Sequence, residues 1–152
     1  LIQEVRTEAS KKINRDLVLD IMGTDIDARM VEIAKENAQK AGVASDITFK
    51  QMRVQDLRSD KINGVIISNP PYGERLSDDA GVTKLYAEMG EVFEPLKTWS
   101  KFILTSDENF EKKFGRQADK KRKLYNGTLK VDLYQFFGDR VRRQATSEKG
   151  NI

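Results

Sequence analysis

Apolar residues along the chain recur at two different spacings, and the spacing changes from one segment to the next. Leu1–Asn14 has apolar residues at roughly helical intervals, and Leu17–Thr24 is a short apolar run typical of a buried strand. An apolar stripe then lies between Asp27, the expected N-cap, and Gly42, the expected end of the segment. This part of the chain is therefore predicted to be helix, strand and helix.

The second half of the chain continues the alternation. Val65–Ile67 is entirely apolar and ends where Pro70 and Pro71 make a further strand ladder impossible. Asn126-Gly127 is a strong hairpin signal between two strand-like runs. The other segments predicted here are a strand over Ile47–Val54, a helix over Val82–Phe93, a strand over Ser100–Thr105, a helix over Asn109–Phe114 and hairpin strands over Lys120–Leu124 and Leu129–Phe137.

Strands that alternate with helices and end in a hairpin predict an α/β fold with a mostly parallel sheet and an antiparallel C-terminal hairpin. We expect residues 1–143 to form this domain and residues 144–152 to be a polar tail. Ligands of such sheets bind at the carboxyl ends of the strands. The residues that directly follow each strand are therefore the candidates for function.

Composition removes several classes of chemistry. The 152 residues include no cysteine and no histidine, which excludes disulfides, Cys/His zinc sites, cysteine nucleophiles and imidazole bases. We therefore expect no metal. No apolar run approaches the roughly 20 residues of a membrane helix, and no signal peptide opens the chain, so we expect a cytoplasmic protein without a membrane partner.

Charge is distributed unevenly along the chain. The net charge is +3, from 27 Lys and Arg against 24 Asp and Glu. Lys112–Arg143 alone contains eleven basic and three acidic residues, a segment charge of +8. A basic C-terminal third is compatible with a solvated face, and equally with binding to a polyanion such as a nucleic acid.

Acidic residues follow the first two predicted strands. Asp25, at the tip of the first strand, is placed to accept hydrogen bonds from a ribose diol, and Ile26 could lie against an adenine ring. Asp56 follows the next strand and could accept from an adenine amine. Helix capping is the alternative for Asp25 and is preferred for Asp27. For Asp56 considered alone, an ordinary loop aspartate is preferred.

The third strand ends in the unusual string Ser68-Asn69-Pro70-Pro71-Tyr72-Gly73. A purine amine is a poor nucleophile because its lone pair is delocalised into the ring. The Asn69 side-chain oxygen and the Pro70 carbonyl could each accept one N–H of that amine and aim its lone pair at an incoming methyl group. Tyr72 would supply a ring on which an extruded base stacks. A rigid Pro-Pro turn that only closes the strand is the alternative.

The run SNPPYGERL at positions 68–76, together with Gly23-Thr24-Asp25-Ile26-Asp27, resembles the RlmL-like 23S ribosomal RNA guanine-N2 methyltransferases. These enzymes pair a THUMP RNA-binding domain with a Rossmann-like class I catalytic domain that uses S-adenosyl-L-methionine, and members are often labelled as N6-adenine-specific DNA methylases. The resemblance extends over about Leu17 to Phe137 and includes the basic run before the hairpin. It implies methylation of guanine N2 in large-subunit ribosomal RNA.

The resemblance also implies roles for individual residues. Asp25 would bind the cofactor ribose, Ile26 and Leu57 would flank its adenine, and Asp56 would contact the adenine amine. Asn69, Pro70, Pro71 and Tyr72 would hold the target base. Glu74 and Arg75 would lie beside the target pocket, with a surface ion pair as the alternative, and the basic run would hold phosphates; its members are Lys120, Lys121, Arg122 and Lys123.

One feature of the resembled family has no counterpart here, because no glycine-rich cofactor loop precedes Asp25. In the family that loop follows a first strand that lies centrally, between the strands at Leu17 and Val65. A sheet without that strand has two apolar edges. We therefore expect the sequence to be part of a longer chain with a THUMP domain upstream, and to be inactive on its own.

Three other functions are compatible with the same residues. The acceptor could be adenine N6 in DNA, or the glutamine amide of a translation release factor, whose methyltransferases also use Asn-Pro-Pro-Tyr. The basic segment argues against a protein acceptor. A nucleic-acid-binding module that has lost the cofactor loop is the non-enzymatic alternative.

Overall fold

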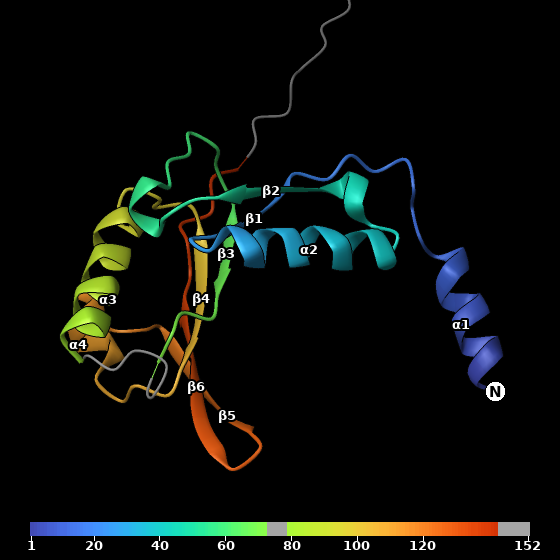
Figure 1. The fold of residues 1–152 in the computed structure, drawn as a ribbon. Helices are drawn as coiled ribbons and strands as arrows, with labels where there is room; N and C mark the ends of the chain where they lie inside the picture. Colours follow the sequence, from blue (N-terminus) through green and yellow to red (C-terminus); the bar gives the residue numbers. More distant parts are fainter. Residues whose placement is uncertain (73–78, 143–152) are drawn as a thin grey trace, which may run out of the picture. The chain divides into compact units, whose positions relative to one another are not determined.

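The computed structural model describes residues 1–72 and 79–142. The chain divides into two compact units, Leu1–Arg53 and Val54–Ile152 (Figure 1). Glu74, Arg75 and the predicted tail at 144–152 lie outside the described residues. None of the described helices is long and apolar enough to cross a membrane.

The first unit is a parallel strand pair with a helix between its strands (Figure 1). The strands pair from Ile21 opposite Ile47 to Asp25 opposite Gln51, and α2 supplies the crossover connection that a parallel pair requires. The connecting helix buries Val31 and contacts both strands. The elements are α1 (Ile2–Lys11), β1 (Ile21–Asp25), α2 (Ala28–Lys40), η1 (Ala44–Asp46) and β2 (Ile47–Gln51).

Both predicted ends of α2 are confirmed by local hydrogen bonds. The Asp27 carboxylate accepts from the Arg29 backbone N–H at 2.9 Å, so Asp27 is the N-cap. Gly42 follows the helix with a φ of 73°, a left-handed conformation that a glycine adopts without strain. The Val43 N–H then donates to the Ala38 carbonyl at 2.9 Å, which closes the last turn.

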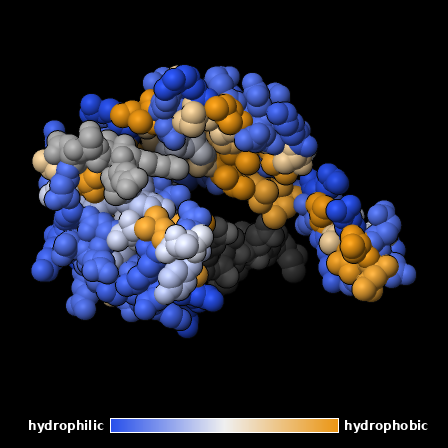
Figure 2. Space-filling model, turned by 60° about the horizontal axis from the view of Figure 1, so that its bottom comes forward, coloured by the Kyte–Doolittle hydropathy of each residue, from blue (hydrophilic) through white to orange (hydrophobic). Residues whose placement is uncertain are grey.

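The first predicted strand begins too early. The strand starts at Ile21 rather than Leu17, because Ile21 is the first residue with a partner on β2. Val18 is 94% exposed, so an apolar side chain at that position has no surface to cover in the described chain. The N-terminal helix α1 also ends earlier than expected, at Lys11, and buries none of its residues; Figure 2 shows exposed apolar side chains on α1.

The second unit contains a four-stranded sheet in the order β3-β4-β6-β5. The pair β3–β4 is parallel, and β6 is antiparallel to both of its neighbours. This confirms the predicted combination of parallel strands with an antiparallel C-terminal hairpin. The elements are η2 (Val54–Asp56), β3 (Val65–Ser68), α3 (Asp79–Phe93), β4 (Ser100–Thr105), α4 (Phe110–Phe114), β5 (Lys120–Asn126) and β6 (Leu129–Phe136).

The observed end of β2 and the loop of the hairpin differ from the expected ones. β2 ends at Gln51 rather than Val54, because Val54–Asp56 turns into a 3₁₀ helix. The hairpin exists, but its two-residue loop is Gly127-Thr128, since Asn126 still pairs with Leu129. Gly127 has a φ of 62° at the first loop position, and this is the position where tight hairpin turns favour glycine.

One face of this sheet is covered by α3 and α4 (Figure 1). Buried residues on α3 recur at the helical spacing of three and four, which predicts a single core-facing stripe; they are Val82, Tyr86, Met89 and Phe93. They pack against Ile103 of β4 and against the aromatic residues of α4 and β6. The helix begins at Asp79, three residues before the predicted start at Val82.

Within the described residues, β1 pairs only with β2, and β3 pairs only with β4. Both β1 and β3 are therefore edge strands in their own sheets. Met22 of β1 is 45% exposed and Ile67 of β3 is 81% exposed. In the described residues, β1 and β3 therefore each lie at a sheet edge and carry exposed apolar side chains.

Candidate active site

Asp25 occupies the carboxyl end of β1, where its side chain is held by a local turn. Its Oδ1 accepts from the Asp27 backbone N–H at 2.8 Å, a hydrogen bond that an aspartate makes to the residue two positions on. No hydrogen bond in the described part of the chain engages its Oδ2. The carboxylate is therefore oriented and retains acceptor capacity for a pair of hydroxyl donors.

Ile26 and Asp27 complete this strand tip with different surroundings. The Ile26 side chain is 65% exposed, and its carbonyl accepts from the Gln51 side chain at 3.0 Å. The Asp27 carboxylate pairs with the Arg29 guanidinium at 2.8 Å. The side-chain hydrogen bond from Arg29 lowers the pKa of Asp27. The Asp27 carboxylate is thus used within α2, as its cap and as the partner of Arg29. The exposed apolar side chain next to Asp25 is that of Ile26.

The second predicted cofactor pair follows β2 and lies in the other unit. Asp56, the last residue of η2, is exposed. Leu57 is half-buried and packs against the aromatic core under α3. Gln55 and Glu88 are joined by a side-chain hydrogen bond, which ties η2 to α3. The packing of Leu57 therefore fixes the backbone that carries Asp56.

The Asn-Pro-Pro-Tyr segment directly follows β3. Asn69 is exposed, Pro70 is buried and Tyr72 is half-buried. The Pro71 carbonyl accepts a hydrogen bond from the Tyr86 hydroxyl at 3.0 Å. The segment therefore presents an amide side chain to solvent at a strand end while its backbone is attached to α3.

Tyr86 and Thr105 are the two residues of this region that the sequence did not single out. Tyr86 and Thr105 are both fully buried, and their hydroxyl oxygens are 2.9 Å apart. The helical spacing of apolar residues around Tyr86 indicates only that it belongs to the core. The sequence offers one signal for Tyr86: its hydroxyl lies on a helix face that is otherwise apolar. A buried hydroxyl requires a hydrogen-bond partner, so this position predicts a buried hydrogen bond.

The four predicted phosphate-binding residues lie on β5, the outer strand of the sheet, and are exposed. Side chains alternate along a strand, so Lys120 and Arg122 share one face and Lys121 and Lys123 share the other. Lys121 Nζ is 3.1 Å from the Glu111 carboxylate and lies over the Tyr134 ring, 5.5 Å from its centroid. Part of the positive charge of this strand is therefore already balanced.

Acidic residues from outside the basic C-terminal segment, Lys112–Arg143, also neutralise part of its positive charge. Lys113 Nζ contacts Asp107 at 2.6 Å and Asp79 at 3.1 Å, and the hydrogen bond from Asp107 is the main reason that the pKa of Lys113 is raised. Lys130 lies 3.6 Å from Glu108. These acids precede the segment in the sequence, so a segment count of +8 omits them.

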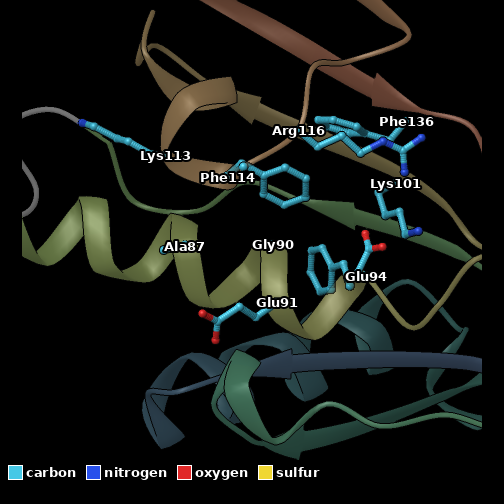
Figure 3. Close-up of a pocket in the computed structure, with 11 residues that line it drawn as sticks. Ala87, Gly90, Glu91, Glu94, Lys101, Lys113, Phe114, Arg116 and Phe136 are labelled. Carbon is cyan, nitrogen blue, oxygen red and sulfur yellow. The ribbon is translucent and has the colours of Figure 1, made fainter.

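A cavity of about 360 Å³ opens between α3, α4 and β6, with Lys101 and Arg116 on its wall (Figure 3). Lys101 is 4% exposed and donates to the Leu96 carbonyl at 2.7 Å. Burial is the main cause of its lowered pKa. Lys101 is near the start of β4, at the opposite end of the sheet from the Asn-Pro-Pro-Tyr segment, so this cavity does not contain the predicted site.

The predicted residues fall into separate groups. Asp25 and Ile26 belong to the first unit, whereas Asp56, Leu57, the Asn69–Tyr72 segment and the basic strand β5 belong to the second. Within the second unit, contacts with α3 hold both the η2 turn and the Asn69–Tyr72 segment.

This arrangement defines the class of protein. Parallel strands joined through helices, an antiparallel β6 inserted between β4 and β5, and polar residues after β1, β2 and β3 are the architecture of a class I S-adenosyl-L-methionine-dependent methyltransferase. The family model described as "RMKL-like, methyltransferase domain" matches residues 1–135. The chain therefore belongs to the RMKL-like methyltransferase domain family.

Individual relatives agree with this family. The chain is 53% identical over 144 residues to "Putative RNA methyltransferase YpsC" of Bacillus subtilis, covering 95% of this chain and 37% of that protein. It is 35% identical over 135 residues to "Ribosomal RNA large subunit methyltransferase K/L" of Legionella pneumophila, covering 88% of this chain and 19% of that protein.

Among solved structures, SMU.472, "a putative methyltransferase complexed with SAH", superposes with a TM-score of 0.87 at 63% identity. The match covers 93% of this chain and 37% of that one. The chain thus spans well under half the length of these three proteins. The predicted cofactor, S-adenosyl-L-methionine, agrees with the family and with the SAH in that complex.

Proposed function

We propose that this chain is the part of a longer enzyme that methylates an exocyclic purine amine, namely guanine N2 in 23S ribosomal RNA, with S-adenosyl-L-methionine as methyl donor. The observation that carries the proposal is the exposed Asn69 side chain at the carboxyl end of a parallel strand. Two of the relatives have RNA or ribosomal RNA in their names. The preference for guanine N2 rests on the resemblance of the SNPPYGERL run.

Asn69 and Pro70 would activate the target amine. The side-chain oxygen of Asn69 and the carbonyl oxygen of Pro70 would each accept one N–H, so that the nitrogen lone pair points away from both acceptors. The nitrogen then forms the new bond to the methyl carbon as the bond from that carbon to sulfur breaks. Water can take the proton that the methylated amine releases. Tyr72 would stack on the extruded base.

Four residues at or beyond the carboxyl ends of β1 and β2 would hold the cofactor. Asp25 would accept from its ribose hydroxyls, Ile26 and Leu57 would contact its adenine, and Asp56 would accept from the adenine amine. The retained acceptor capacity of Asp25 and the exposure of Ile26 support these roles. When bound, S-adenosyl-L-methionine supplies an electrophilic methyl group on its sulfonium.

The RNA would be contacted by basic residues and by the segment beyond Tyr72. Lys120, Arg122 and Lys123 have exposed side chains on β5 and would bind phosphates, with a smaller contribution from Lys121 because Glu111 already balances it. Glu74 and Arg75, outside the described residues, would lie beside the target base. A THUMP domain elsewhere in the longer protein would add RNA affinity.

The proposed function is tested by nucleoside mass spectrometry of ribosomal RNA and DNA from cells with and without the gene. Loss of N2-methylguanosine from 23S ribosomal RNA in the deletion strain, with recovery on complementation, is the expected result. Loss of N6-methyladenine instead would replace guanine by adenine as the acceptor. Unchanged modification of RNA and DNA would contradict the proposal and favour a binding module.

Replacing Asp25 with alanine in the full-length protein should weaken cofactor binding. Two hydrogen bonds to a charged carboxylate would be lost, so the Kd for S-adenosyl-L-methionine should rise by about 10- to 100-fold, measured by calorimetry. Asp27→Ala is the matched control, because it removes the same charge two residues away but only a helix cap. Equal effects of the two substitutions would contradict the role of Asp25 in cofactor binding.

Removing two charges from β5 should weaken RNA binding in a salt-dependent manner. The double variant Lys120→Gln/Arg122→Gln should reduce the slope of log K against log salt by about 1 for each phosphate contact that is lost. The double variant Lys11→Gln/Lys40→Gln removes the same charge from α1 and α2 and should leave the slope unchanged. Identical slopes for both variants would show that β5 makes no phosphate contact.

A further inference from the structure

A chain of hydrogen bonds links the loop after β4 to the Asn-Pro-Pro-Tyr segment after β3. The Asp107 backbone N–H donates to Thr105 Oγ1 at 3.1 Å. Thr105 Oγ1 is 2.9 Å from the Tyr86 hydroxyl, which donates to the Pro71 carbonyl at 3.0 Å. Residues from two loops, one helix and one strand thus meet in one connected network.

The chemistry of the two ends fixes the direction of every bond in this network. A carbonyl oxygen only accepts and a backbone N–H only donates. The single hydroxyl proton of Tyr86 is therefore used on Pro71, and the proton between Tyr86 and Thr105 must come from Thr105. Thr105 can then receive the Asp107 N–H on its own oxygen. Each hydroxyl donates once and accepts once, and no alternative arrangement satisfies all four groups.

Burial makes this network rigid. Tyr86 and Thr105 have no exposed surface, so water cannot replace a lost partner. The Tyr86 ring packs edge-on against Phe110, with centroids 5.0 Å apart. Burial is also the main reason that the pKa of Tyr86 is raised, which keeps the hydroxyl protonated and able to donate throughout the neutral range.

The far end of the network is anchored as well. The Asp107 carboxylate accepts from the Asn109 backbone N–H at 2.8 Å and from Lys113 Nζ at 2.6 Å. The loop after β4 is therefore fixed to α4 before it contributes its N–H to Thr105.

Two consecutive prolines explain why the segment requires such an attachment. Pro70 and Pro71 have no backbone N–H, so these two residues cannot be fixed by donating to a neighbouring strand. Only their carbonyl oxygens are available for backbone hydrogen bonds, and the donor must come from another group. Tyr86 supplies that donor from behind the segment, on the core side.

We propose that Tyr86, oriented by Thr105, is a positioning residue that fixes the Asn69–Tyr72 segment through the Pro71 carbonyl and so sets the direction of the acceptors for the target amine. The inference rests on the proposed role of Asn69 in methyl transfer. In this proposal, Tyr86 affects the rate of the chemical step through the Pro71 carbonyl and contacts neither substrate.

The test is steady-state and single-turnover methylation by the full-length enzyme carrying Tyr86→Phe, which keeps the ring and removes only the donor. The rate of methyl transfer should fall by about 10- to 100-fold, since a small misplacement of a reacting group has an effect of this size. The Kd for S-adenosyl-L-methionine should be unchanged. A rate equal to that of the wild type would overturn the proposal.

Lys101→Met is the matched control for a buried donor to a backbone carbonyl. Lys101 is 4% exposed and donates to the Leu96 carbonyl at 2.7 Å, at the opposite end of the sheet from the Asn-Pro-Pro-Tyr segment. This variant leaves the Leu96 carbonyl without its donor, so it should lower the melting temperature while retaining the wild-type rate. An equal loss of rate in Tyr86→Phe and Lys101→Met would mean that the rate falls through general loss of stability, and this would overturn the proposal.

Thr105 gives a second test if Tyr86→Phe does not fold. Thr105→Ser keeps the hydroxyl and should retain the wild-type rate, whereas Thr105→Val removes it and should slow the reaction several-fold. Equal rates for Ser and Val would contradict the role of the network. Asn69→Ala separates this inference from the proposed function: if Asn69→Ala is inactive and the network variants are fully active, only the positioning role fails, and if Asn69→Ala is fully active, the proposed function itself fails.

Discussion

Replacing Asn69 with alanine in the full-length enzyme is expected to lower the rate of methyl transfer by about 100- to 1,000-fold, the usual effect of removing one preorganised polar group that stabilises a transition state. The substitution removes a proposed acceptor of the target amine and leaves that nitrogen with its lone pair delocalised. Asn69 is exposed, so little packing is lost. The measurement is single-turnover transfer of labelled methyl groups to ribosomal RNA, alongside the Kd for S-adenosyl-L-methionine, which should stay unchanged.

A matched control separates chemistry from the loss of an asparagine. Asn109 is also exposed and makes no side-chain cap to α4, so Asn109→Ala should retain the wild-type rate. Asn69→Asp keeps an oxygen acceptor at the same position and should lose less activity than Asn69→Ala. Wild-type activity of Asn69→Ala would remove the central step of the proposed mechanism.

The features predicted correctly from sequence are those that depend on neighbours along the chain. The cap at Asp27 and the left-handed Gly42 are decided within a few residues by local hydrogen bonds. The hairpin around Gly127 is similarly local. The end of β3 was predictable because two prolines stop a strand regardless of the surroundings.

The features that the sequence could not predict depend on contacts between distant segments. The start of β1 is decided by where β2 can pair with it, not by the apolar character of Leu17. Lys113 pairs with Asp107 and also with Asp79, which is 34 positions away in the sequence, so a count along a segment overestimates the available charge. The attachment of Pro71 to Tyr86 has no local pattern, because it requires the packing of α3 against the sheet.

That packing depends on Phe110, and the largest expected effect on stability follows from it. Phe110 is fully buried on α4, with its ring 5.0 Å from Tyr86 and Phe114 and 4.8 Å from Tyr134, measured between centroids. A helix of five residues cannot be stable by itself. The interactions of Phe110 with the core, together with those of Phe114, therefore hold α4 against the sheet.

Phe110→Ala is expected to lower the free energy of opening of the second unit by about 3 to 5 kcal/mol, since both the transfer of the ring and the cavity left behind contribute. Native-state hydrogen exchange of the full-length protein measures this directly, in the amides of α3, β4 and β6. Phe137→Ala is the control. Phe137 is 50% exposed, so its replacement should lower the free energy of opening far less.

The Tyr86 ring packs against the Phe110 ring, so Phe110→Ala should also slow methyl transfer at temperatures where the unit is still folded. Full protection in Phe110→Ala would mean that α4 is held by other contacts and that Tyr86 is fixed without it.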